Sequence, residues 1–133
     1  MKKLVLLLVV VSLFIASPVL AANGKKLLND CNNVIKYQQN KSDKTVSVLG
    51  AGLCYGYIGS TIDTHASLTE FFNRDKLFCS PADLKSGDAA RIVVNYLKKY
   101  PQKSNELAYD LVLEALIEAF PCLQSKLNFK PLF

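Results

Sequence analysis

Four cysteines and one histidine are the side chains in this sequence with the clearest potential for chemistry. Zinc sites need clustered cysteine and histidine ligands, but no two cysteines have C-x-x-C spacing and His65 is the only histidine. A nucleophile–base pair would require His65 beside a free thiol or an activated serine. We therefore predict no catalytic set, no metal site and no cofactor, and we do not expect an enzyme. The cysteines are Cys31, Cys54, Cys79 and Cys122.

Residues 1–22 have the pattern of a secretory signal peptide. Two lysines precede an apolar run and a small-residue cleavage site, which is the order found in such signals. Cleavage after Ala21 or Ala22 would release one domain, residues 23–133, into the periplasm without a membrane segment. An uncleaved membrane anchor is the alternative interpretation. In a small exported chain, an even number of cysteines favours two disulfides.

The formal net charge of the chain is weakly positive. It is +5 for the full sequence, and loss of Lys2 and Lys3 with the signal peptide leaves +3. The remaining basic residues are spread along the chain without forming a block. This distribution disfavours a nucleic-acid partner.

Apolar residues recur at helical spacing through most of the mature chain, and no segment has a convincing strand pattern. We predict an all-α fold, a small disulfide-linked bundle of four to five helices. The tail 123–133 alternates apolar and basic residues, which is compatible with packing against the body. The expected helices cover 23–39, 45–62, a short segment from Ser67, 86–100, and a last helix that Ser104 or Asn105 caps and Pro121 ends.

The stretch 45–62 has no charged residue and contains four glycines. A glycine inside a helix costs about 1 kcal/mol relative to alanine, so these glycines require a reason. Gly52 and Gly56 lie on one helical face and Gly59 follows, a spacing that lets a neighbouring backbone approach closely. We predict a buried helix that the other helices surround. A transmembrane span is the alternative, near the lower limit of length.

The segment Ser67–Glu70 has the spacing of a helix-capping box. We therefore predict that a short, separate helix begins at Ser67. Its buried face would consist of Leu68, Phe71 and Phe72. Residues 77–81 would follow as an extended connection, because the closing proline disfavours helix at the residue before it.

The order of the helices predicts how the cysteines pair, although the sequence alone permits three connectivities. The last two helices are joined by a short turn and must run antiparallel, which places Cys79 near Cys122. The same reasoning places Cys31 opposite Cys54 across the first helical hairpin. We predict the pairs Cys31–Cys54 and Cys79–Cys122.

An acidic line runs along the last predicted helix. Its members are four residues apart and share one face, where like charges repel each other weakly. One interpretation pairs the line with the neighbouring antiparallel helix, placing Arg91 near Glu118 and Lys98 near Asp110. The other interpretation is an acidic surface for a basic partner. The line consists of Glu106, Asp110, Glu114 and Glu118.

Four segments occur in an order that is similar to a known family: CYGYI at 54–58, FCSP at 78–81, VNYLKKYP at 94–101 and LVLEALIEAFPC at 111–122. Together, behind a signal peptide, they resemble the Rap/Tai family of immunity proteins, which protect bacteria against type VI secretion amidases. The resemblance covers Cys31 to Cys122. Ser60 and Asp88 depart from the glycine and glutamine that the family often has there, which bears on the effector that is recognised.

The resemblance implies a small helical periplasmic protein, usually a homodimer, that binds a peptidoglycan-cleaving cysteine amidase and plugs its active-site cleft. In such pairs the amidase supplies the catalytic groups, in agreement with the missing catalytic set. A loop or helix end would enter the cleft, and the candidates are residues 99–105 and 63–76. The candidate partner-binding residues are Lys99, Tyr100, Gln102 and Lys103 in the first segment, and Asp63, His65 and Arg74 in the second.

Two functions of other classes remain as alternatives at this point. An acid-stress periplasmic chaperone would also be small, helical and disulfide-bonded, and an aggregation assay at low pH would distinguish it. A carrier of a small apolar ligand is suggested by the wide apolar helix faces, and a large apolar cavity would support it.

Overall fold

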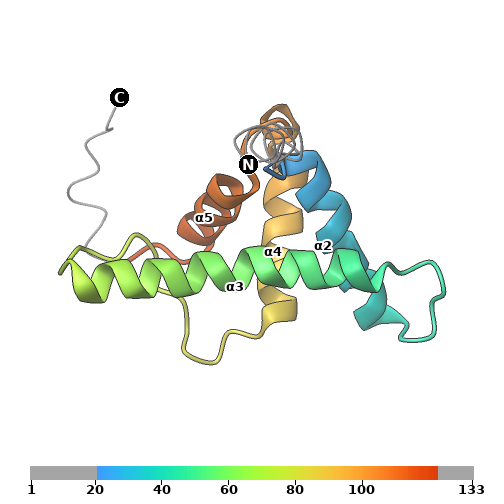
Figure 1. Ribbon diagram of the computed structural model, residues 1–133, viewed down its shortest axis with the longest axis horizontal. Helices are drawn as coiled ribbons and strands as arrows, with labels where there is room; N and C mark the ends of the chain where they lie inside the picture. Colours follow the sequence, from blue (N-terminus) through green and yellow to red (C-terminus); the bar gives the residue numbers. More distant parts are fainter. Residues whose placement is uncertain (1–20, 123–133) are drawn as a thin grey trace, which may run out of the picture.

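The computed structural model describes residues 21–122; most of the predicted signal peptide and the whole tail 123–133 lie outside the described residues. Within this part, helices follow one another along the chain and the only β pairing is one isolated bridge (Figure 1). The predicted all-α fold is confirmed. The elements are α2 Gly24–Gln39, α3 Val48–Phe71, α4 Ser86–Lys99, the 3-10 turn η1 Pro101–Lys103, and α5 Ala108–Ala119.

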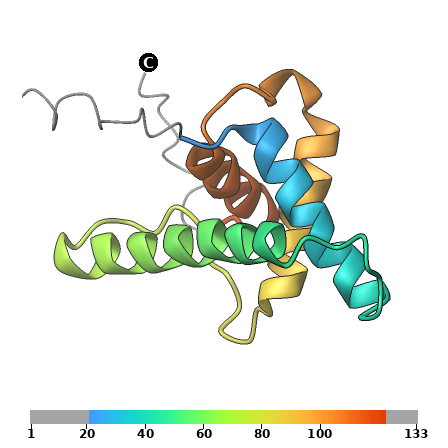
Figure 2. The same cartoon turned by 45° about the vertical axis from the view of Figure 1, so that its right-hand side comes forward.

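The helices form a bundle in which α3 lies across the other three (Figures 1 and 2). Each helix contributes fully buried aliphatic side chains to one shared core, among them Leu27 of α2, Ile58 of α3, Val93 of α4 and Leu111 of α5. Burying one such side chain contributes about 1.5–3 kcal/mol. The amphipathic pattern of α2, α4 and α5 therefore accounts for their packing.

Helix α2 begins where the sequence predicted. The side chain of Asn23 accepts a hydrogen bond from the Lys26 amide at 3.1 Å, which satisfies one of the free N–H groups at the helix start. The residues Leu27, Cys31 and Val34 then fall on the buried face.

The start of α5 differs from the prediction, because neither Ser104 nor Asn105 caps it. The helix begins at Ala108 and has no side-chain cap. The chain from 104 to 108 instead pairs with the chain around the start of α2. The Gly24 amide donates to the Glu106 carbonyl at 3.0 Å, and the Ala108 amide donates to the Ala22 carbonyl at 2.8 Å. Backbone pairing with a distant segment thus replaces a local cap.

The glycine-rich face of α3 is not buried, which corrects the prediction that other helices surround it. A Cβ atom built on Gly52, Gly56 or Gly59 would meet no atom within 4 Å. Close approach occurs instead at Gly50, where a Cβ would lie 2.9 Å from the side-chain nitrogen Nδ2 of Asn33. Spacing alone marks small residues on one face, whereas only the packed structure shows whether a neighbour occupies that face.

These surroundings predict opposite effects for alanine at different glycines. Gly52→Ala should raise the free energy of unfolding by about 0.5–1 kcal/mol, because alanine lowers the conformational entropy of the unfolded chain and its Cβ meets no neighbour. Gly24→Ala should lower it by about 1–3 kcal/mol, because its Cβ would lie 2.6 Å from Leu111 Cδ1 and 3.2 Å from the Lys103 carbonyl oxygen. Urea unfolding of dilute protein measures both; equal shifts would contradict this assignment.

Helix α3 is also longer than predicted. It continues without a break through Ser67 to Phe71, so the Ser67–Glu70 segment is helix interior and not the start of a separate helix. The reason is that no glycine or proline interrupts residues 60–71, and Thr61 donates its hydroxyl to the Tyr57 carbonyl within the turn. No helix within residues 21–122 combines the length and apolar character that crossing a membrane requires.

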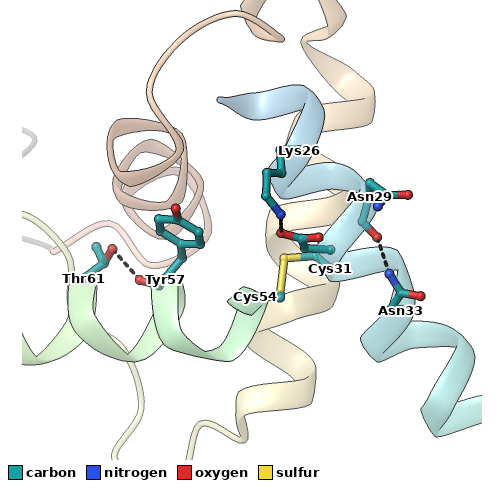
Figure 3. Close-up of a disulfide and its surroundings, with 8 residues drawn as sticks. Lys26, Asn29, Cys31, Asn33, Cys54, Tyr57 and Thr61 are labelled. Carbon is teal, nitrogen blue, oxygen red and sulfur yellow. Dashed lines mark hydrogen bonds and ion pairs between the residues drawn. A yellow bond between two sulfur atoms is a disulfide. The ribbon is translucent and has the colours of Figure 1, made fainter. Parts of the chain in front are cut away.

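Both predicted disulfides are confirmed. Cys31 of α2 is bonded to Cys54 of α3, as Figure 3 shows, and Cys79 in the connection after α3 is bonded to Cys122 beyond α5. The two Cα atoms of each pair are 5.0 Å apart, within the ordinary range. Because the four sulfur atoms are bonded in two pairs, they cannot act as free nucleophiles or zinc ligands.

The polar contacts around the first disulfide join α2 to the start of α3. The Asn33 side chain donates to the Asn29 carbonyl, as drawn in Figure 3, and accepts from the Ser47 amide at 2.9 Å. Ser47 in turn caps α3 by accepting from the Gly50 amide. This chain of hydrogen bonds fixes the direction in which α3 leaves α2.

Candidate functional site

The C-terminal part of α3 extends beyond the helices that pack against it (Figures 1 and 2). The 24 residues of α3 span about 36 Å at 1.5 Å per residue, whereas α2, with 16 residues, spans about 24 Å. Because the other helices cross α3 and do not run along it, they cover only the part of α3 where they cross (Figures 1 and 2). We call residues 63–77, the end of α3 and the chain that turns back from it, the α3 arm.

The α3 arm carries a group of exposed apolar side chains. Phe71 is 83% exposed and Phe72 is 65% exposed, and Leu68 and Leu77 are each 46% exposed. The sequence predicted Leu68, Phe71 and Phe72 as a buried face, and that prediction is wrong because no helix within residues 21–122 covers this end of α3. Grouped exposed apolar residues are typical of surfaces that bind a partner.

His65 holds the returning chain against α3. Its Nε2 atom accepts a hydrogen bond from the Leu77 amide at 2.9 Å, and its ring stacks on the ring of Phe78 with centroids 4.2 Å apart. Burial, and to a smaller extent the positive charge of Lys76, lowers the pKa of His65 below its ordinary value. His65 therefore serves the structure as a neutral hydrogen-bond acceptor.

The base of the arm is tied to the end of α5. The Cys79 amide donates to the Phe120 carbonyl at 2.8 Å, and the Cys79–Cys122 disulfide adds a covalent link at the same place. Phe78, between His65 and this link, is buried in the core. The arm thus projects from a fixed base.

A surface hollow of about 460 Å³ lies between the arm and its base. Its apolar floor includes Ile62 and Phe78, and its charged groups are Glu70, Arg74 and Lys76. With both signs of charge beside an apolar floor, the hollow is suited to contacts with a mixed protein surface. Its lining residues are Ile62, His65, Ala66, Thr69, Glu70, Arg74, Lys76, Phe78, Cys79 and Ser80.

The other predicted binding segment, residues 99–105, is engaged in contacts within the molecule. Lys99 and Tyr100 both bond to the Glu118 carboxylate, at 2.8 and 2.9 Å. Lys103 bonds to Glu114 at 2.7 Å, and this contact raises the pKa of the Lys103 ammonium. These side chains are committed to partners on α5.

Three members of the acidic line, Glu106, Glu114 and Glu118, contact lysines, but not the cations that the sequence predicted. Arg91 contacts Gln38 and Asp88 instead of Glu118. Lys99 and Lys103 supply the charges because they lie at the end of α4 and in η1, beside the last turns of the antiparallel α5. A shift of one residue, from Lys98 to Lys99, moves a lysine by about 100° around a helix.

Tyr96 completes this network from α4. Its hydroxyl donates to Glu114 at 2.7 Å. Burial, followed by this hydrogen bond, raises the pKa of the Tyr96 phenol to about 12. Both contacts end on Oε2 of Glu114, so Tyr96 and Lys103 are joined through one carboxylate oxygen on α5.

The candidate residues therefore separate into free and committed groups. Asp63, Arg74 and Gln102 are exposed, whereas His65, Lys99, Tyr100 and Lys103 are held by contacts within the molecule. The sequence reasoning missed Phe71 and Phe72 as surface residues. The signal that could have found them is the uninterrupted helical stretch from 48 to 71, which is longer than any other described helix.

A family model describing Rap1a immunity proteins matches residues 23–122. The chain belongs to the Rap1a immunity protein family. No curated protein and no solved structure shows significant similarity to it. Membership confirms the resemblance seen in the sequence, and it implies a cognate effector and an inhibitory role that needs no catalysis. The match begins at the cap of α2 and ends at the last disulfide cysteine, so it covers the α3 arm.

Proposed function

We propose that this immunity protein acts in the periplasm, where it blocks a peptidoglycan-cleaving amidase delivered by type VI secretion. The family match supports an immunity role, and the two disulfides suit an oxidising compartment outside the cytoplasm. We further propose that the α3 arm is the part that enters the active-site cleft of the amidase. The protein would inhibit by occupying the cleft and excluding substrate.

The shape of the arm is the observation that carries this proposal. An enzyme cleft is concave, and the arm is a projecting element with Phe71 and Phe72 near its end. Aromatic side chains can bury large areas in a cleft at low cost in conformational entropy. Arg74, which is exposed beside them, adds a charged donor at the rim. Neither property depends on a catalytic group in the immunity protein.

The turn 99–105 is the weaker candidate for the same role. Binding through Lys99 or Lys103 would require them to leave Glu118 or Glu114. The loss of the existing ion pair would offset part of the free energy gained from a new one, since exposed ion pairs contribute only about 0–1 kcal/mol. The arm carries exposed groups without such commitments.

The contacts of Ala22 bear on the site at which the signal peptide is cleaved. Ala22 is buried and its carbonyl accepts from the Ala108 amide, so cleavage after Ala21 would preserve a contact that cleavage after Ala22 would remove.

The exposed glycine face of α3 bears on the proposed homodimer. This face lies next to Val48 and Leu49, which are strongly exposed. We propose that a second copy covers this face.

Reconstitution with a type VI secretion amidase from the same organism tests the proposal. The mature protein should form a stable complex with the amidase and abolish hydrolysis of peptidoglycan stem peptides at equimolar concentration. Mass spectrometry of the exported protein and analytical ultracentrifugation report its first residue and its oligomeric state. An amidase from an unrelated family is the control. Unchanged hydrolysis in the presence of excess immunity protein would refute the proposed function.

A further inference from the structure

One imidazole joins the two sides of the α3 arm. His65 projects from α3, is 8% exposed, and receives the Leu77 amide hydrogen on its Nε2 atom. Its ring stacks on Phe78 with an interplanar angle of 25°. The contact requires a neutral ring, because a protonated imidazole has no lone pair with which to accept a hydrogen bond. The contact between Leu77 and α3 therefore depends on the charge of one side chain.

The charged groups around this contact do not compensate a charge on the ring. From the returning chain, Arg74 and Lys76 line the same hollow, and both are positive. From α3, Glu70 is the acidic group of the hollow. Of these charges, that of Lys76 lowers the pKa of His65, so it disfavours a positive charge on the ring.

We propose that His65 is a pH-sensitive latch. When Nε2 takes up a proton, the Leu77 amide loses its acceptor and residues 75–77 detach from α3, whereas the Phe72 and Arg74 amides keep their bonds to the Leu68 and Thr69 carbonyls. The rest of the bundle stays folded, because the Cys79–Cys122 disulfide and the Cys79 amide still hold the base of the arm to α5. The latch changes the shape of the arm without unfolding the core.

The direction of the pH dependence follows from burial. The pKa of His65 in the folded protein is lowered, whereas an unfolded chain takes up the proton near pH 6.5. The unfolded state therefore binds more protons in this range, and stability rises with pH. The stabilisation by the latch is fully present above pH 6.5 and is lost as the pH falls through the lower pKa of the folded state.

Nuclear magnetic resonance of the mature protein tests the latch without any partner. Because the chain has a single histidine, its ring signals are assigned directly. The hydrogen-exchange protection of the Leu77 amide, corrected for the intrinsic effect of pH, should fall by about tenfold with the same midpoint as the His65 ring. The Leu27 amide, which donates to the carbonyl of Asn23 at the start of α2, should stay protected. A Leu77 amide that does not respond while His65 titrates would overturn the proposal.

The variant His65→Gln separates the charge from the hydrogen bond. Its side-chain carbonyl can still accept from Leu77 but does not titrate, so Leu77 protection should become independent of pH between 4.5 and 8. If the pH dependence persisted in this variant, another group would be responsible and the latch would be rejected. The wild-type titration decides the question by itself if the variant does not fold.

A consequence for the effector rests on the proposed function. The exposed Leu77 lies on the segment that the latch releases and Arg74 directly precedes it, so the complex should be weaker at pH 5 than at pH 7.5 in the wild type and less affected in His65→Gln. Absence of binding at both pH values would refute the proposed function and leave the latch intact, because the resonance measurements use no effector. Equal pH effects on binding in the wild type and in His65→Gln would show that the latch does not control binding of the effector.

Discussion

Replacing Phe71 and Phe72 together by serine should weaken the complex with the amidase by about 30- to 1,000-fold, which corresponds to about 2–4 kcal/mol. The reason is that both rings are mostly exposed in the free protein and would become buried only in the complex. Burial of apolar area contributes about 25 cal/mol per Å², and aromatic side chains are frequent among the residues that dominate binding. Isothermal titration calorimetry measures the change.

The same substitutions should leave the immunity protein folded. Exposed substitutions usually change the free energy of unfolding by no more than about 0.5 kcal/mol, and neither ring packs in the core. A matched control is Tyr37→Ser with Leu107→Ser, which removes two exposed apolar side chains outside the arm. If the control weakened binding as much as the arm variant, or if the arm variant bound normally, the α3 arm would not be the binding element.

Removal of the Cys31–Cys54 disulfide by alanine at both positions should lower the free energy of unfolding by about 4–5 kcal/mol. The bond closes a loop with a sequence separation of 23, for which the chain-entropy model predicts about 3.5 kcal/mol. Both cysteines are also fully buried, so the shorter side chains leave unfilled space in the core and add to the loss. Urea unfolding followed by circular dichroism measures the difference.

The second disulfide provides the comparison. It has a sequence separation of 43, and loop entropy alone predicts about 4 kcal/mol. Cys79 is exposed, however, so Cys79→Ala with Cys122→Ala leaves less unfilled space. The two variants distinguish entropy from packing: a larger loss for the Cys31–Cys54 pair shows that packing decides, and the reverse order would contradict the prediction. Because a domain of this size has about 5–15 kcal/mol of net stability, loss of both disulfides should unfold it.

Much of this fold follows from local patterns in the sequence. The cap at Asn23 and the apolar face of α2 depend on residues within a few positions of each other. The pairing of the cysteines followed from one short turn, which forces two helices to run antiparallel and brings their ends together. Such inferences are reliable because they use the geometry of a single helix or a single hairpin.

The candidate site was predicted only in part. Residues 63–76 were identified as one of two possible binding segments, but the exposure of Phe71 and Phe72 was not. Apolar residues at helical spacing look the same in sequence whether or not a neighbour covers them. The commitment of Lys99 and Lys103 to α5 was missed for a related reason: which lysine reaches a given carboxylate depends on the rotation of one helix against another.

By itself, the sequence determined the helical class, the two disulfides and the absence of free thiols, because these depend on composition, spacing and short turns. Only the tertiary structure decided which face of α3 is covered and how far the helix projects. The physical reason is the crossing: α3 is the longest of the described helices and lies across the others, so its C-terminal end beyond the crossing faces solvent. That end belongs to the α3 arm, the surface on which the proposed function depends.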